Sequence, residues 1–157
     1  MKITDKLHKS TIIQLKGNDR STIIHELLDH LVYNNYLERS AKLFSFIDSK
    51  ESCNSSNIGR GVAFPHSISN EIKDLVCILG ISRSGVVYDE GDVHPCHLVL
   101  LSLSPENSPD IHRKFISKFQ LLLSDIELKE SIINFYSLEK IEQLLTNWEI
   151  KQMEELL

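Results

Sequence analysis

The sequence predicts a layered α/β domain, because stretches with helical spacing stand at both ends of the chain around short strand-like runs in the middle. The central runs are apolar or β-branched and are bounded by glycine, proline, aspartate or serine. The length of 157 residues suits one domain with a sizeable hydrophobic core. We therefore expect a single domain over residues 1–157.

The first elements are expected to be a short strand and two helices. Residues 11–15 form a plausible strand. After two candidate N-caps, Asp19 and Ser21, apolar residues recur at helical spacing over 23–32, and a second helix is expected over 37–47. The stretch 48–60 looks irregular and is expected to be a loop that leads into the chemistry.

The middle of the chain changes to runs of apolar and β-branched residues that are too short for helices. Such runs are typical of buried strands when turn-forming residues bound them. Three strands are therefore expected, over residues 61–64, 75–82 and 98–103.

The C-terminal third is expected to be helical. Ser108 is a candidate N-cap, Pro109 fits the first helical position, and Asp110 places a negative charge in the first turn. A helix beginning near residue 109 is the firmest local prediction. Two further helices are expected over 125–135 and 137–148.

The composition excludes several classes of protein. The net charge of -5 and the pI near 5.8 give no positive field for binding a nucleic-acid backbone. No apolar run approaches the roughly 20 residues that cross a bilayer, and the first residues lack a signal peptide, so we expect a cytoplasmic protein without direct membrane insertion. The three cysteines have no CxxC spacing, and His94 and His97 would point to opposite faces of a strand, so no disulfide framework and no metal site are expected.

The segment from Asn57 to His66 carries the main chemical signal. Its two glycines permit close backbone approaches, which suits a loop that wraps an anion. Pro65 restricts the backbone on both sides, so His66 is presented from a stiff chain. From these residues alone, the alternative that Pro65 and His66 simply end a strand stays open.

The run from Lys50 to His66 closely resembles, without a gap, the active-site signature of enzyme IIA proteins of the phosphoenolpyruvate-dependent phosphotransferase system, in the fructose/mannitol and nitrogen-regulatory class. Further blocks agree in order at 78–82, at 97–101 and around His112, so the similarity covers nearly the whole chain. The resemblance implies a three-layer domain with a central mixed sheet flanked by helices. It also implies a phosphoryl carrier that needs no cofactor.

The resemblance further implies roles for individual residues. His66 stands where the family histidine accepts phosphate from a histidine-containing phosphocarrier protein, and such a histidine must be neutral with a fixed tautomer. A second histidine, matched by His112, lies beside it in the family. The residues expected to bind phosphate are Lys50, Ser55, Ser56 and Arg60.

Four positions depart from the family pattern. Lys50 replaces an arginine and supplies charge without the planar two-pronged contact of a guanidinium. Arg60 replaces an asparagine, and it suits either a phosphate contact or a solvated loop position. Asn57 and Ser67 stand where glycine is common. These departures affect the expected rate of phosphotransfer and the choice of partner protein more than the fold.

Three functions are compatible with the resemblance. The first is a nitrogen-regulatory enzyme IIA that controls target proteins through its phosphorylation state. The second is a sugar-specific enzyme IIA that passes phosphate to a IIB partner in fructose- or mannitol-type uptake. The third is an interaction module of the same fold without phosphotransfer. Because no IIB or membrane segment follows the IIA-like region, we expect the free-standing regulator.

Overall fold

Two long strands form the centre of the fold because most of their residues are apolar and buried. In the computed structural model, which describes residues 1–134 and 137–157, β4 (Val76–Val86) pairs antiparallel with β5 (Cys96–Ser104). One short strand pairs parallel with β4, and two pair parallel with β5, so the sheet is mixed. These are β1 (Ile12–Gln14) on β4, and β2 (Val62–Ala63) and β3 (His66–Ile68) on β5.

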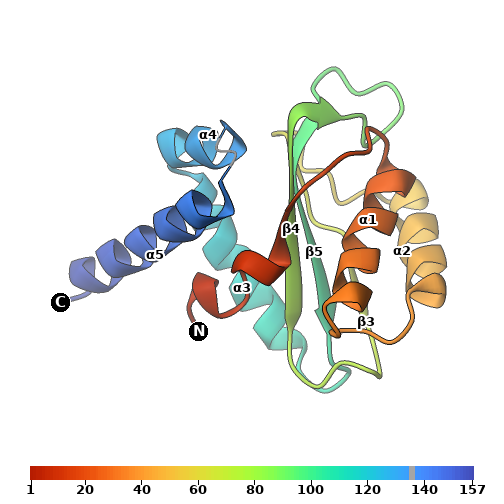
Figure 1. The fold of residues 1–157 in the computed structure, drawn as a ribbon, viewed down its shortest axis with the longest axis horizontal. Coiled ribbons are helices and arrows are strands. Elements are labelled where there is room, and N and C mark those ends of the chain that lie inside the picture. Colours follow the sequence, from red (N-terminus) through yellow and green to blue (C-terminus); the bar gives the residue numbers. More distant parts are fainter. Residues whose placement is uncertain (135–136) are drawn as a thin grey trace.

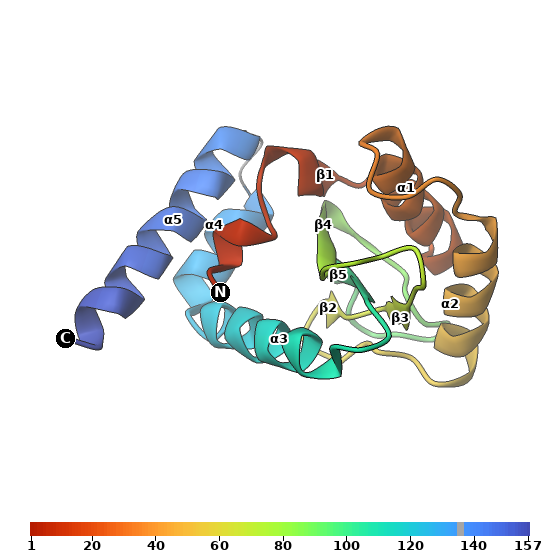
Figure 2. The ribbon, with the colours of Figure 1, turned by 90° about the horizontal axis from the view of Figure 1, so that it is seen from below.

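The helices lie in two groups on opposite faces of this sheet, as Figures 1 and 2 show, and the C-terminal end of the last helix projects away from the sheet. None of the described helices combines the length and the apolar content needed to cross a membrane. One face carries α1 (Arg20–Tyr33) and α2 (Ala41–Cys53), and the other carries α3 (Pro109–Leu123), α4 (Ile126–Asn134) and α5 (Leu138–Glu155) with the N-terminal 3-10 turns η1 (Ile3–Asp5) and η2 (Lys9–Thr11).

Strand β5 shows how both faces of the sheet are buried. Its side chains alternate: Leu98 and Leu100 join the apolar cluster under α3, α4 and α5, while Val99, Leu101 and Leu103 join the cluster under α1 and α2. All five are fully buried. A strand buried on both faces reads as a continuous apolar run, which is the pattern seen in the sequence.

The predicted fold class is confirmed, and two predicted helix starts are close to the observed ones. Asp19 caps α1, because its side chain accepts a hydrogen bond of 2.9 Å from the Thr22 amide. Helix α3 begins at Pro109 as predicted, but the Ser108 side chain makes no capping hydrogen bond.

The loop predicted over residues 48–60 is wrong in its first part. Helix α2 continues to Cys53, because Ile47 and Glu51 lie four residues apart and both face the interior. The polar residues between them form the solvent side of that helix and hide its periodicity. The helix predicted over 125–135 is observed to Asn134, and its last predicted residue lies outside the described residues.

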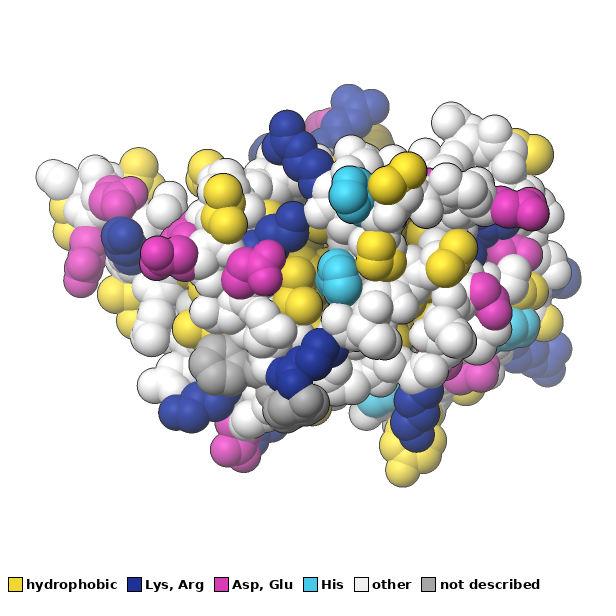
Figure 3. Space-filling view, turned by 90° about the horizontal axis from the view of Figure 1, so that it is seen from above, with side chains coloured by type: hydrophobic (Ala, Val, Ile, Leu, Met, Phe, Trp, Pro, Cys, Tyr) yellow, Lys and Arg dark blue, Asp and Glu magenta, His cyan; other side chains and the backbone are white. Residues whose placement is uncertain are grey.

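Charged side chains of both signs are interspersed on the face of the molecule shown in Figure 3, with hydrophobic and histidine side chains among them. A protein that follows a nucleic-acid backbone presents a continuous basic stripe. This face has no such stripe, in agreement with the net charge of -5.

Two adjacent leucines in α3 test the layer arrangement. Leu122 is fully buried in the cluster under α3, α4 and α5, whereas Leu121 is 54% exposed. We expect Leu122→Ala to lower the free energy of unfolding by about 2–5 kcal/mol, through lost burial and the cavity left behind. Leu121→Ala should lower it by less than about 1 kcal/mol. Urea denaturation of both variants measures the difference, and equal losses would contradict the packing described here.

Candidate functional site

Strand β3 presents His66 at the surface. Its residues alternate between exposed and buried, so His66 and Ile68 face outward while Ser67 faces the interior. His66 pairs in register with Ser102 of β5, and the carbonyl of Pro65 accepts a hydrogen bond of 3.0 Å from the Ser102 amide. The sheet itself therefore fixes the backbone of this histidine.

A second histidine lies directly beside the first. His112 is in the first turn of α3, the helix that follows β5, and its ring centroid lies 4.8 Å from that of His66 with an angle of 33° between the ring planes. The two rings are close enough for both to contact the same small group. Within the described residues, the buried Nε2 of His112 has no hydrogen-bond partner. A buried polar atom without a partner is uncommon and is available to a ligand.

The hydrogen bond of His66 defines which of its nitrogens is free. Its Nδ1 lies 3.3 Å from the carbonyl oxygen of Phe64. A carbonyl oxygen only accepts hydrogen bonds, so Nδ1 carries the proton in the neutral ring. The lone pair is then on Nε2, which is the nitrogen able to attack an electrophile.

Lys50 joins the last turn of α2 to this site. Its ammonium donates a hydrogen bond of 2.5 Å to the carbonyl oxygen of His66 and lies 5.8 Å from the ring centroid of Phe46. Partial burial lowers the pKa of Lys50, and the neighbouring charge of Glu51 opposes this. The ammonium places positive charge at the backbone of the reactive histidine, which favours an anion there.

Both histidines are kept neutral by their surroundings. Partial burial, followed by the charge of Lys50, lowers the pKa of His66, against smaller opposing effects from the Phe64 hydrogen bond and the Glu51 charge. Burial lowers the pKa of His112 to about 4, with further contributions from His66, Lys50 and Arg113. At neutral pH the site therefore offers unprotonated imidazole nitrogen as a nucleophile.

A buried acid supports the loop in front of His66. Glu51 is 1% exposed and accepts hydrogen bonds from the Tyr88 hydroxyl at 2.5 Å, from the Ser56 amide at 3.2 Å and from the Ser56 hydroxyl. Burial and the bond to Glu51 raise the pKa of Tyr88 well above its usual range. Sequence reasoning assigned no role to Glu51 or Tyr88. The available signal for Glu51 was its place beside Lys50 in the family-like segment.

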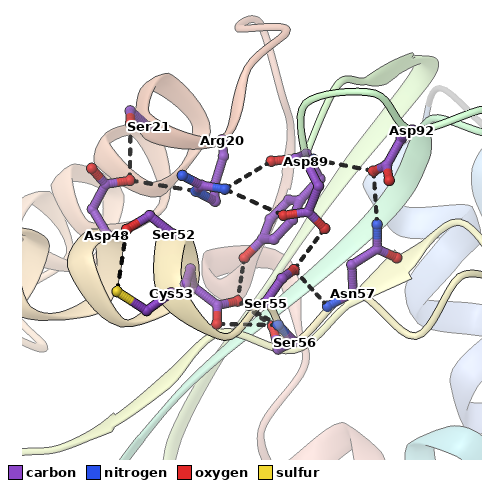
Figure 4. A network of polar contacts seen from close by, with 12 residues as sticks. Arg20, Ser21, Asp48, Ser52, Cys53, Ser55, Ser56, Asn57, Asp89 and Asp92 are labelled. Atoms are coloured by element: carbon purple, nitrogen blue, oxygen red, sulfur yellow. Dashed lines mark hydrogen bonds and ion pairs between the residues drawn. The ribbon is translucent and has the colours of Figure 1, made fainter.

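A wider polar network surrounds this acid and is shown in Figure 4. Arg20 of α1 forms ion pairs with Asp48 at 3.6 Å and with Asp89 at 3.3 Å. The Ser55 hydroxyl donates to Asp89 at 2.7 Å, and the Asn57 side-chain amide donates to Asp92 at 3.0 Å. The network thus ties the loop after α2 to α1 and to the turn after β4.

The structure brings three of the predicted site residues together, namely His66, His112 and Lys50. The hydroxyls of Ser55 and Ser56 donate to carboxylates within the polar network. Arg60 is exposed, and its carbonyl oxygen accepts a hydrogen bond of 2.8 Å from Lys129 of α4. A contact of Ser55, Ser56 or Arg60 with phosphate stays a prediction.

An open groove of about 910 Å³ runs beside His66, between α2 and β3. Its lining includes Lys50 and His66, with Phe46 and Ile68, whose side chains are each 57% exposed. The His66 ring therefore stands at an accessible, partly apolar edge of the molecule.

Comparison with protein families gives one match over most of the chain. The family model described as "Phosphoenolpyruvate-dependent sugar phosphotransferase system, EIIA 2" matches residues 6–148. A curated relative, the fructose-specific EIIABC component of the PTS system of Bacillus subtilis (strain 168), is 28% identical over 142 residues. Those residues are 90% of this chain, and they make up 22% of the relative's own length.

Solved structures show the same fold. The nitrogen regulatory protein IIA-Ntr of Neisseria meningitidis superposes with a TM-score of 0.78 and 26% identity, over 91% of this chain and 98% of that one. The mannitol IIA of Escherichia coli superposes with a TM-score of 0.75 and 19% identity, over 89% and 99% of the two chains. The same mannitol enzyme in complex with phosphorylated enzyme IIB superposes with a TM-score of 0.74 and 20% identity, over 90% and 98%.

The lowered pKa of His112 predicts a specific titration. We expect its imidazole to stay neutral as the pH falls from the ordinary histidine value of 6.5 to about 4. In that window the unfolded chain binds a proton at this residue that the folded chain does not, so the contribution of His112 makes folding stability decrease as the pH falls. An NMR titration of the ring proton measures the midpoint, with His112→Gln to assign the signal. A midpoint at 6.5 or above would contradict the prediction.

Proposed function

The chain belongs to the EIIA 2 family of the phosphoenolpyruvate-dependent sugar phosphotransferase system, whose domains are phosphotransferases, and on this basis we propose that it carries a phosphoryl group on Nε2 of His66. The observation that carries the proposal is the free Nε2 of a neutral His66, whose Nδ1 is directed at the Phe64 carbonyl and whose ring lies 4.8 Å from that of His112. The protein acts in this role as a single domain over residues 1–157.

The reaction is an in-line transfer between two imidazole rings. Nε2 of neutral His66 attacks the phosphorus of a phosphohistidine on the donor, and a new N–P bond forms as the donor's N–P bond breaks. The donor nitrogen recovers its electron pair, and His66 keeps its proton on Nδ1. Such a transfer requires positioning and charge stabilisation more than covalent chemistry from the protein.

Positive charge and hydrogen-bond donors around His66 stabilise the transferred group. Lys50 supplies the nearest ammonium, at the His66 carbonyl. His112 lies at the N-terminal end of α3, where the helix dipole favours negative charge. Its Nε2 has no hydrogen-bond partner within the described residues and is available to contact the transferred group. Secondary candidates for contacting the transferred group are Ser55, Ser56 and Arg60. Each serine hydroxyl would first have to leave the carboxylate to which it donates.

The donor in this proposal is a histidine-containing phosphocarrier protein, and the role is that of a cytoplasmic nitrogen-regulatory enzyme IIA. The similarity to IIA-Ntr of Neisseria meningitidis supports this role, because it reaches 26% identity and covers 98% of that protein. In such a role the phosphorylation state of His66 governs binding to a regulatory target protein.

A second candidate is a sugar-specific enzyme IIA that passes phosphate to a IIB partner. The fructose-specific relative in Bacillus subtilis favours this candidate at 28% identity. The mannitol IIA of Escherichia coli, solved in complex with phosphorylated enzyme IIB, shows that this fold occurs in such complexes. The two candidates share the phosphorylated residue and differ in the acceptor.

Phosphorylation in vitro tests the proposal. Incubation with phosphoenolpyruvate, enzyme I and a histidine-containing phosphocarrier should place acid-labile phosphate on the wild-type protein and essentially none on His66→Ala. His112→Ala should slow labelling on the order of 100-fold, as loss of a donor to developing charge does in other enzymes. His94→Ala is the matched control and should be labelled like wild type.

The outcomes separate the three candidate functions. Label that passes onward to a IIB protein supports sugar uptake, whereas label that stays on the protein and changes its binding to a target supports regulation. Absence of label on the wild type would overturn the phosphoryl-carrier proposal and would leave an interaction module of the same fold.

A further inference from the structure

We propose that Glu51 is a positioning residue for His66, which acts through Ser56 and the Phe64 backbone to hold the His66 proton on Nδ1. This inference rests on the proposed function, since Nε2 is then the phosphoryl acceptor. It assigns a role to a buried acid that does not itself reach the reacting atoms.

Glu51 lies where an acidic side chain costs free energy, because it is removed from water. Its side chain lies in the interior of the protein, 1% exposed. A buried carboxyl group requires hydrogen bonds to offset its lost hydration. Glu51 receives these from Ser56 and Tyr88, and within the described residues it forms no ion pair within 4.0 Å. The acid is therefore held by donors on two different loops.

The Ser56 hydroxyl links the side chain of Glu51 to the backbone amide of Phe64. A hydroxyl has one proton to donate, and Ser56 directs it to Oε1 of Glu51. Its lone pairs then face away from the carboxylate, and one accepts a hydrogen bond of 3.0 Å from the Phe64 amide. Without an acceptor at Glu51, the hydroxyl would be free to rotate and the Phe64 amide would lose a fixed partner.

Phe64 transmits this constraint to His66. Its ring is 7% exposed and makes an edge contact with Phe119 at 6.2 Å between centroids, while Pro65 restricts its backbone from the other side. With its amide held by Ser56, the carbonyl of Phe64 has little freedom to turn. That carbonyl is the group 3.3 Å from Nδ1 of His66. A continuous hydrogen-bonded path thus leads from Glu51 to the reactive ring.

Other acids in the same network lack such a path. Asp48 and Asp89 are partly exposed and pair with Arg20 (Figure 4). Arg20 also donates a hydrogen bond of 3.2 Å to the Tyr88 carbonyl, which helps to fix the loop that carries the Tyr88 hydroxyl. The outer acids hold the loops in place, and Glu51 connects them to the site.

The tautomer of His66 provides a direct test that needs no phosphate. In the unphosphorylated protein, two-bond ¹H–¹⁵N correlations of the ring distinguish the Nδ1–H form from the Nε2–H form. We expect the wild type to show the Nδ1–H form. In Glu51→Met both acceptor oxygens are lost, so the hydroxyls of Ser56 and Tyr88 lose the atom to which they donate, and in Ser56→Ala the path is cut. Both variants should show a mixture of the two forms.

The same variants should slow phosphorylation of His66 by roughly 10-fold, the size of effect that orienting hydrogen-bond partners have elsewhere. Ser56→Thr keeps the hydroxyl and should restore both the tautomer and the rate. Ser21→Ala is the matched control, because the Ser21 hydroxyl also donates to a carboxylate of the network, Asp48 at 2.9 Å, yet within the described residues it makes no hydrogen bond to Glu51, Ser56 or Phe64. It should leave both readouts unchanged.

The results separate this inference from the proposed function. Pure Nδ1–H tautomer in both Ser56→Ala and Glu51→Met would overturn the inference, whatever the phosphorylation rate. If Glu51→Met does not fold, as judged by its amide spectrum, Ser56→Ala alone decides. A tautomer change in a protein that accepts no phosphate would support the positioning path and reject the phosphoryl-carrier proposal.

Discussion

The parallel pairing of β3 with β5 is the constraint on which the site depends. Because His66 pairs with Ser102 near the end of β5, and α3 starts soon after that strand ends, the pairing places His66 beside the first turn of α3. The contact with His112 follows from this register. A shift of one residue would turn His66 to the interior face of the sheet and remove it from its partner.

Much of this arrangement was accessible from the sequence, because it depends on local patterns. Apolar spacing and capping residues located α1 and α3, and the continuous apolar runs located β4 and β5. The family resemblance singled out His66, His112 and Lys50, and these lie together in the structure. The end of α2 was missed because every residue from Asp48 to Ser52 is polar, the buried Glu51 included, so no apolar repeat marks the helix there.

The buried polar contacts could not be predicted in the same way. Tyr88 lies far from Glu51 along the chain, and nothing in its neighbourhood signals that its hydroxyl reaches a buried acid on α2. Ser55 and Ser56 illustrate the limit further, because adjacent serines in one loop donate to different carboxylates. The folded arrangement of α1, α2 and two loops determines which of these groups form hydrogen bonds. Patterns in the sequence indicate only local preferences.

The polar network of Figure 4 also has a consequence for how related proteins can diverge. Glu51 and Tyr88 at its centre are buried, whereas Asn57 is partly exposed and Asp92 is exposed. A substitution at the outer edge alters the support of the Ser55–Ser56 loop while the surface around His66 and Phe46 keeps its shape. Reactivity of the histidine and recognition by its partners are then separate traits, and selection can adjust one while it conserves the other.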